Sequence, residues 1–343
     1  MDIEEEWMNF CNNTEPENIK INNTKSCLLD SEIPKSSDIY ISTKTKIVYL
    51  SDPIKLKENF WKISLVDYSN PCEGVIKKQI KYNFENIKEV EEVEELLKNE
   101  NIVEQHIISK NKPSSQFKDV RKISIGICKR DIMSHRSKKK SAFYNCFVLI
   151  LRLKINNKFK EAHVKIFNTG KLEIPGIQTD EFMDIILEKL LEIFKNNCNL
   201  TLKINKNTCE TVLINSNFSC GYYVNREKLH DILKYKYKIH TSYDPCSYPG
   251  IMSKFWYNNN KSEQTGIKES DSSQQISFMI FRTGSVLIVG KCNESILLTI
   301  YEFLKKLFIT EYSEINQITE EDIKSNNKIK KKRKKILKIL ISN

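Results

Sequence analysis

Apolar and polar positions alternate from residue 39 onward in segments typical of strands and helices. Residues 39–50 ("IYISTKTKIVYL") alternate, and residues 147–155 ("FVLILRLKI") are almost continuously apolar, as buried strands are. Residues 87–98 instead place their apolar side chains at helical spacing and five glutamates between them. This pattern predicts a helix with one buried face, formed by Val90, Val93 and Leu97.

One hairpin pattern occurs twice. "IFNTGKLEIPG" (166–176) and "IFRTGSVLIVG" (280–290) are identical at six of eleven positions and lie 114 residues apart. A Thr-Gly pair in each predicts the turn between two strands. Each copy is followed by apolar residues at helical spacing: Phe182, Ile186, Leu190 and Ile193 in the first, and Ile296, Ile300, Leu304 and Leu307 in the second. The repeated order of strand, helix, strands and helix predicts an α+β fold with two similar halves.

Both faces of the second hairpin are apolar. Side chains alternate between the faces of a strand, so one face holds Phe278, Ile280, Val286 and Ile288, and the other holds Met279, Phe281, Leu287 and Val289. The following helix covers only one face. Two interpretations remain for the other: a second layer of this same chain, or a surface that binds a ligand.

Charge and cysteine content exclude several classes of protein. The formal net charge is +11, and residues 328–338 ("KIKKKRKKILK") alone hold eight basic residues and no acid. This segment is either an arm that binds phosphates or a localisation signal. The ten cysteines form no C-x-x-C pair, the five histidines show no metal-ligand spacing, and no apolar run approaches ~18–20 residues. We therefore expect no disulfide framework, no metal site, no signal peptide and no membrane span.

The sequence contains no catalytic motif. A glycine-rich phosphate loop, G-x-S-x-G, H-E-x-x-H and acid clusters with metal spacing are all absent from it. His163 precedes a hairpin strand, and we interpret it as a strand-face residue rather than a base. We expect a binding protein, with neither enzymatic activity nor a cofactor.

Several segments, in order, resemble the TATA-box-binding protein family. "YDPCSYPGI" (243–251), "FMIFRTGSVLIVG" and "ESILLTIYEFLKKLF" resemble its second repeat. "FVLILRL", "VKIFNTGKLEIPG" and "EFMDIILEKLLEIF" resemble its first repeat. The resemblance covers roughly residues 121–200 and 208–310. A second register starts it near Ile47 and makes about 80–160 partly an insertion. The composition is similar to that of the divergent versions carried by large DNA viruses.

The resemblance implies a saddle: a curved antiparallel sheet with pseudo-twofold symmetry and helices on its convex face. The expected organisation has an acidic, polar N-terminus and a first repeat with an insertion, followed by a second repeat and a basic tail. Their ranges are 1–38, 39–205 with the insertion at about 80–120, 206–312 and 313–343.

In this family, pairs of phenylalanines wedge between base steps at each end of a bent site. The resemblance places hairpin wedges at Phe167 and Phe281 and a third wedge at Tyr248. The fourth position falls on Cys146 in one register and on Phe147 in another, and "YSNPCEGVIKK" (68–78) echoes the second repeat without deciding between them. The resemblance adds further DNA-binding positions around these wedges: Met279, Leu287, Val289 and Lys165.

The chain departs from the family at several positions. Pro175 and Val289 stand where the family has a hydrogen-bonding threonine, and the family's asparagines have no clear match, although Asn215 and Asn217 lie close by. Lys165 and Glu173 occupy the outer face of the first hairpin, where they are expected to pair across the strands. Strict recognition of a TATA sequence is therefore not expected.

The resemblance also implies partners. These are AT-rich promoter DNA in the minor groove, and a factor-IIB-like protein and RNA polymerase on the convex helices, with the chain itself a monomer. It places the protein inside the cell, in a cytoplasmic virus factory or the nucleus, with packaging in the virion as a further alternative. The alternative is a protein–protein scaffold whose saddle no longer binds DNA.

Overall fold

The computed structural model describes residues 33–110, 117–133 and 144–317. Most of the N-terminal segment and the basic tail expected from the sequence lie outside these residues. The described strands form one twelve-stranded antiparallel sheet in the order β3-β4-β2-β5-β6-β7-β1-β8-β12-β11-β10-β9. The fold is therefore α+β, as the sequence predicts, and both copies of the hairpin lie in the same sheet.

The strands and helices follow the chain in two series. The strands of the first series are β1 (Tyr40–Leu50), β2 (Gly74–Phe84), β3 (Val103–Lys110), β4 (Asp119–Gly126), β5 (Cys146–Ile155), β6 (Lys158–Phe167) and β7 (Lys171–Ile177). Its helices are α2 (Leu56–Lys62), α3 (Ile87–Lys98), α4 (Lys129–Met133) and α5 (Asp180–Cys198). The strands of the second series are β8 (Ile204–Ser219), β9 (His240–Asp244), β10 (Tyr248–Tyr257), β11 (Gln274–Ile280) and β12 (Ser285–Gly290). Its helices are α6 (Arg226–Asp231), the π-helical turn η1 (Ile232–Lys236), α7 (Glu294–Thr310) and α8 (Tyr312–Ile315).

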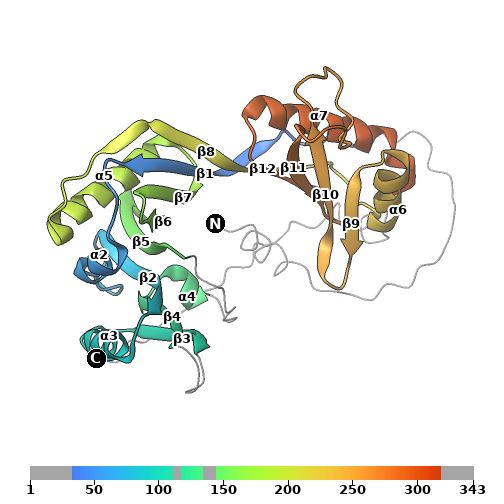
Figure 1. Cartoon of the computed structure of the whole chain (residues 1–343). Coiled ribbons are helices and arrows are strands. Elements are labelled where there is room, and N and C mark those ends of the chain that lie inside the picture. The colour runs from blue at the N-terminus through green and yellow to red at the C-terminus, as the bar shows by residue number, and fades with distance from the viewer. Residues whose placement is uncertain (1–32, 111–116, 134–143, 318–343) are drawn as a thin grey trace.

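The sheet is curved, with α5 and α7 on its outer side (Figure 1). Each of these helices begins at a residue that caps it: the Thr179 side chain accepts a hydrogen bond from the amide of Phe182, and Asn293 accepts one from Ile296. The apolar residues expected on these two helices are all buried, as are those expected on α3. Local periodicity therefore predicted these helices and their buried faces correctly.

Two hydrophobic cores lie between the sheet and the outer helices. One packs α2 and α5 against β5, β6 and β7, and the other packs α6 and α7 against β10, β11 and β12. β1 and β8 join them, and ion pairs from β1 to each long helix, Lys46–Asp180 and Lys44–Glu294, cross the junction. The helix-facing residues expected in the second hairpin are all in this core: Phe278, Ile280, Val286 and Ile288.

The two series differ in one long connection. Three residues join β9 to β10, whereas residues 85–145 join β2 to β5 and carry α3, β3, β4 and α4. β4 pairs with β2, and β3 with β4, so the connection extends the sheet beyond β2. α4 lies on the inner side of the curve (Figure 1).

Candidate nucleic-acid interface

The face of the sheet opposite α5 and α7, here called the open face, carries a row of apolar side chains in the second series. Met252, Met279 and Leu287 are aligned in register on neighbouring strands, and Asn217 of β8 continues the row. They alternate along their strands with the core residues of the other face. Met252 is 41% exposed, whereas Val289, on the same face, is buried.

Two aromatic rings stand together at the end of this row. The ring centroids of Tyr248 and Phe281 are 6.1 Å apart, with 57° between the ring planes. Gly250 lies between them: a Cβ atom there would be 2.7 Å from the Phe281 ring and 3.0 Å from the Tyr248 ring. The absence of a side chain at Gly250 therefore allows the two rings to approach each other.

The corresponding place in the first series holds one aromatic ring. Cys146 and Phe167 are directly opposite each other on β5 and β6. Phe147, expected as a possible DNA-binding residue, instead points to the helix-covered face, where it is fully buried with its ring centroid 6.1 Å from that of Phe60. That expectation was wrong, because a shift of one residue along a strand moves the side chain to the opposite face. The register with Cys146 on the open face is the one the structure adopts.

Charged side chains lie beside Phe167. Lys165 and Glu173 are opposite each other on β6 and β7, and Lys165 Nζ is 2.6 Å from Glu173 Oε1, which confirms the pair expected from the sequence. Each side chain is 23% exposed. The Lys171 ammonium group is 4.7 Å from the centroid of the Phe167 ring. The first series thus offers ionic contacts where the second offers apolar ones.

A polar pair marks the junction of the two series on the open face. Asn215 of β8 and Thr43 of β1 are opposite each other, and Asn215 Nδ2 donates to Thr43 Oγ1 at 3.2 Å. Both residues are buried, and Asn215 Oδ1 has no hydrogen-bond partner in the described part of the chain. Sequence reasoning noted Asn215 only as a neighbour of an expected asparagine, and it missed Thr43.

α4 covers part of the open face of the first series. Cys128 packs with Ile76 and Ile150, and burial raises the pKa of its thiol to about 12. Lys77 Nζ donates to Asp131 Oδ2 at 2.8 Å. Burial alone would raise the pKa of Asp131, but Lys77 and the hydrogen bonds from Cys128 outweigh it and leave this pKa below its usual value. These contacts hold α4 against the sheet.

A second segment is held over the same end of the sheet by one guanidinium group. Arg152 of β5 is buried and donates to the main-chain oxygens of four residues: Asp67, Tyr68, Asn70 and Cys72. Next to it, Glu161 Oε1 accepts a hydrogen bond from the amide of Lys129 at 2.9 Å. Burial raises the pKa of Glu161 despite this hydrogen bond. The open face of the first series is therefore both more charged and more covered than that of the second.

The chain was compared with known proteins. No protein-family model matches it. It is 27% identical over 207 residues to a curated protein named "TATA-box-binding protein-like" from Acanthamoeba polyphaga mimivirus. The chain is similar to the TATA-box-binding proteins.

This similarity confirms the resemblance inferred from the sequence motifs, including its viral character. The aligned region is 54% of this chain and 54% of the mimivirus protein, so the match spans about half the length of that relative. Among solved structures, the chain is similar to Methanococcus jannaschii TBP, with 14% identity and a TM-score of 0.37. That match covers 81% of this chain and 99% of the archaeal one.

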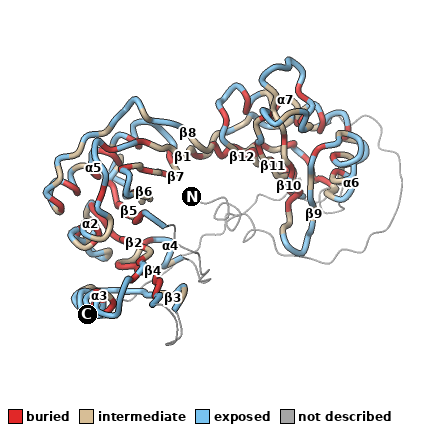
Figure 2. Tube along the Cα trace, in the orientation of Figure 1, coloured by how far each residue is buried: buried red, intermediate tan, exposed pale blue. Residues whose placement is uncertain are grey.

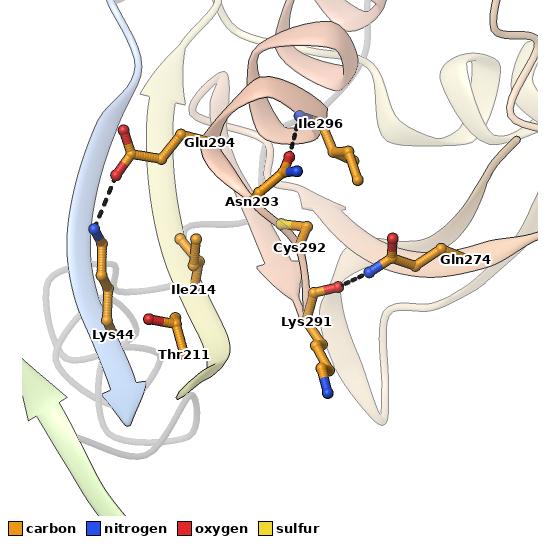
Figure 3. Close-up of a pocket in the computed structure, with 9 residues that line it drawn as sticks. All are labelled: Lys44, Thr211, Ile214, Gln274, Lys291, Cys292, Asn293, Glu294 and Ile296. Atoms are coloured by element: carbon orange, nitrogen blue, oxygen red, sulfur yellow. Dashed lines mark hydrogen bonds and ion pairs between the residues drawn. The ribbon is translucent and has the colours of Figure 1, made fainter. Parts of the chain in front are cut away.

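A pocket on the helix-covered side lies where β1 and β8 meet the start of α7 (Figure 3). Lys44 and Glu294 form an ion pair at one side of it, and Gln274 donates to the carbonyl of Lys291 at another. None of the open-face residues described above lines it.

The described residues offer neither a metal site nor a membrane-spanning helix. No group of three or more histidine, cysteine, aspartate or glutamate side chains in that part of the chain is placed to hold a metal ion. No helix within it has the length and apolar content needed to cross a membrane.

Proposed function

We propose that this chain is a TATA-box-binding-protein-like transcription initiation factor that binds the minor groove of promoter DNA on its open face. The observation that carries the proposal is the pair of rings at Tyr248 and Phe281, closed over Gly250 at the end of an apolar row. It is supported by the similarity to a protein named TATA-box-binding protein-like.

The apolar row suits a minor groove of A·T pairs. Such a groove presents only acceptor atoms, whereas a G·C pair adds the protruding 2-amino group of guanine. The apolar side chains of Met279 and Leu287 would pack against the floor of the groove at A·T steps. At a G·C pair, the 2-amino group of guanine would prevent this contact. Proteins that bend DNA from this side, TATA-box-binding proteins among them, insert apolar wedges at a cost of a few kcal/mol per unstacked step. Tyr248 and Phe281 would be the wedge of the second series. Phe281 is only 3% exposed, so its ring would swing outward when DNA binds.

Asn215 would supply one polar contact at the centre of the site. Its amide has one end bound to Thr43 and the other without a partner in the described residues. The threonine hydroxyl can donate as well as accept, so turning the amide over would keep this hydrogen bond and place the NH₂ group where the buried Oδ1 atom now lies. The side chains around Asn215 would have to move aside for that group to reach a base. The acceptors of an A·T pair would receive it.

The two series would form the halves of a saddle related by an approximate twofold axis, with residues 39–205 and 206–312 as its two repeats. Duplex DNA would lie along the open face. The outer helices α5 and α7 would remain accessible to a factor-IIB-like protein and RNA polymerase, because the DNA would lie on the opposite face of the sheet.

Replacing bases in a short labelled duplex tests this proposal. Fluorescence anisotropy should give similar affinity for an A·T-rich duplex and one in which inosine·cytosine pairs replace A·T, since inosine lacks the 2-amino group. Affinity should fall when G·C pairs replace the A·T pairs. Inosine and guanine present the same acceptors in the major groove, so a difference between these two duplexes reports on the minor groove. Equal affinity for all three duplexes would show that the minor groove is not read.

A second function is favoured by the Lys165–Glu173 pair and by α4, which put charge and a covering helix on the open face of the first series. In this alternative, the face holds a protein rather than DNA. Absence of binding to any of the three duplexes at low salt, by a folded chain, would favour it.

A further inference from the structure

The edge of the sheet formed by β3 is exposed along its length. In the part of the chain that the structure describes, β3 pairs only with β4. Six of its eight residues are exposed, as the colouring of Figure 2 indicates. Natural proteins protect such edges with proline, inward-pointing charge, short strands or a covering element, because an open edge pairs with other chains. β3 contains no proline, and its lysine is at its last residue, Lys110.

The unpaired backbone groups of β3 can be assigned from the register. The amide of Gly126 donates to the carbonyl of Ile102, which makes these two residues a hydrogen-bonded pair. Bonded and non-bonded pairs alternate in an antiparallel ladder. The N–H and C=O groups of Val103, Gln105 and Ile107 therefore point away from β4, toward the open edge.

Apolar side chains accompany this edge. The exposed fractions are 61% for Ile102, 50% for Ile107, and 36% each for Val103 and Ile108. On a strand whose outer edge is unpaired, such side chains pack against the residues of an added strand. The edge offers both main-chain hydrogen bonds and apolar contacts.

The segment that carries α3 and β3 is acidic, although the whole chain is basic and the neighbouring strand β4 places Lys122 opposite His106. Residues 85–110 contain eight carboxylates and three lysines, a net charge of −5, whereas the complete chain carries +11. Glu91 on α3 and Glu104 on β3 are exposed, and neither has an ion-pair partner among the described residues. An added strand with positive charge would be attracted, and an acidic one repelled.

A buried network holds this edge in one shape. Arg121 of β4 donates to both carboxylate oxygens of Asp119, and a further nitrogen of its guanidinium group donates to Glu94 of α3 and to Gln105 of β3. The Asp119 side chain is 2% exposed. One guanidinium group thus connects the helix and both strands, so the edge needs little reordering when a partner binds.

We propose that β3 is a docking edge for a lysine- or arginine-rich extended segment of a partner protein, which adds to the sheet as a further strand. The main-chain groups of Val103, Gln105 and Ile107 would bind its backbone. Glu104 of β3 would attract its basic side chains, and Glu91 of α3 would add to the negative potential of this segment. This site lies on the connection that separates β2 from β5, outside the open face, and does not depend on the proposed DNA binding.

A designed peptide of alternating lysine and valine is the probe, and a peptide of alternating glutamate and valine is its charge control. In titrations with the full chain, we expect the lysine peptide to bind, and its affinity to fall as added salt screens the charges. In hydrogen-exchange measurements, the bound peptide should protect the amides of Val103, Gln105 and Ile107. We expect the glutamate peptide not to bind. Equal binding of the two peptides, or no protection of these amides, would overturn the proposal.

Two substitutions at one position separate backbone from side chain. Ile107→Pro removes an N–H group that points to the open edge and should weaken peptide binding about tenfold or more. Ile107→Thr keeps this group and should retain binding within about threefold. Circular dichroism and the melting temperature show whether Ile107→Pro remains folded. If it does not, the double variant Glu91→Lys, Glu104→Lys provides the test, because it leaves the backbone groups of β3 intact. This variant should bind the lysine peptide more weakly and should now bind the glutamate peptide.

Other occupants of the edge give different results. A dimer in sedimentation that Ile107→Pro dissociates would assign the edge to a second copy of this chain. Binding of the lysine peptide only after truncation at Gln317 would assign it to the chain's own basic segment. Either result would overturn the proposal of a partner protein.

Discussion

Tyr248 and Phe281 lie side by side over Gly250, with ring centroids 6.1 Å apart. Phe281 follows the last residue of β11, and Tyr248 is the first of β10, so strand pairing brings together residues 33 positions apart. The corresponding place in the first series joins Phe167 to Cys146. This difference between the two series underlies the first prediction.

Alanine substitutions at Phe281, Tyr248 and Phe167 should show that the two series contribute unequally to DNA binding. We expect Phe281→Ala to weaken binding to an A·T-rich duplex about tenfold or more, because stacking of one ring on a base contributes about 1–3 kcal/mol. Phe167→Ala should weaken it less, and Tyr248→Ala should be intermediate. Fluorescence transfer between dyes at the duplex ends measures affinity and bend together. Equal losses at Phe167 and Phe281 would contradict the asymmetry, and Leu298→Ala, exposed on α7, is a matched control.

A methyl group at Gly250 should disturb the aromatic pair. Gly250→Ala places a Cβ atom 2.7 Å from the Phe281 ring, which forces the rings apart. We expect a loss of about 1–3 kcal/mol in the free energy of unfolding, as for other overpacked sites, and weaker DNA binding. Adding Phe281→Leu should recover part of the stability but not the binding. Urea unfolding of both variants measures these changes in the free energy of unfolding. An unchanged stability of Gly250→Ala would show that the rings move aside freely.

The ion pair on the first hairpin should respond in opposite directions to its two neutral variants. Lys165→Met leaves the Glu173 carboxylate facing the duplex and should weaken DNA binding, whereas Glu173→Gln should strengthen it. The reason is that Glu173 and Lys165 now neutralise each other at 2.6 Å. Anisotropy titrations at two salt concentrations measure the effect, which should shrink at the higher one. The same direction of change in both variants would show that the pair does not face DNA.

The basic segment 328–338 should contribute charge without sequence preference. If it contacts phosphates, deletion of residues 328–338 should flatten the dependence of log K on log salt by about 0.9 for each lost contact. The ratio of affinities for A·T-rich and G·C-rich duplexes should hardly change, because phosphate contacts position a protein without specifying sequence. An unaltered slope would assign the segment to localisation or protein docking.

Asp131→Asn should loosen α4 in a pH-dependent way. The pKa of Asp131 is lowered in the folded chain, so the carboxylate contributes stability that is present above its unfolded pKa and is lost as pH falls through the folded value. We expect the variant to be about 1–2 kcal/mol less stable at neutral pH, allowing for the partial exposure of Asp131. The difference should disappear at acidic pH. A difference independent of pH would show that the charge of Asp131 plays no part.

The sequence by itself determined what depends on neighbouring residues. The turns at Thr169-Gly170 and Thr283-Gly284, the inward faces of α3, α5 and α7, and the Lys165–Glu173 pair all follow from periods of two or 3.6 residues and from the register of a tight hairpin. The paired motifs also carried the resemblance that the mimivirus protein confirms.

Only the tertiary structure decided what depends on long-range strand pairing. β2 and β5 pair across the connection 85–145, and no local pattern indicates which residue of β5 lies opposite which residue of β2. That register placed Cys146 on the open face and Phe147 in the core. A strand shifted by one residue would turn every one of its side chains to the opposite face of the sheet. It also placed α4 on the open face and Thr43 opposite Asn215, because contacts between residues distant along the chain form only when the whole sheet has closed around its two cores.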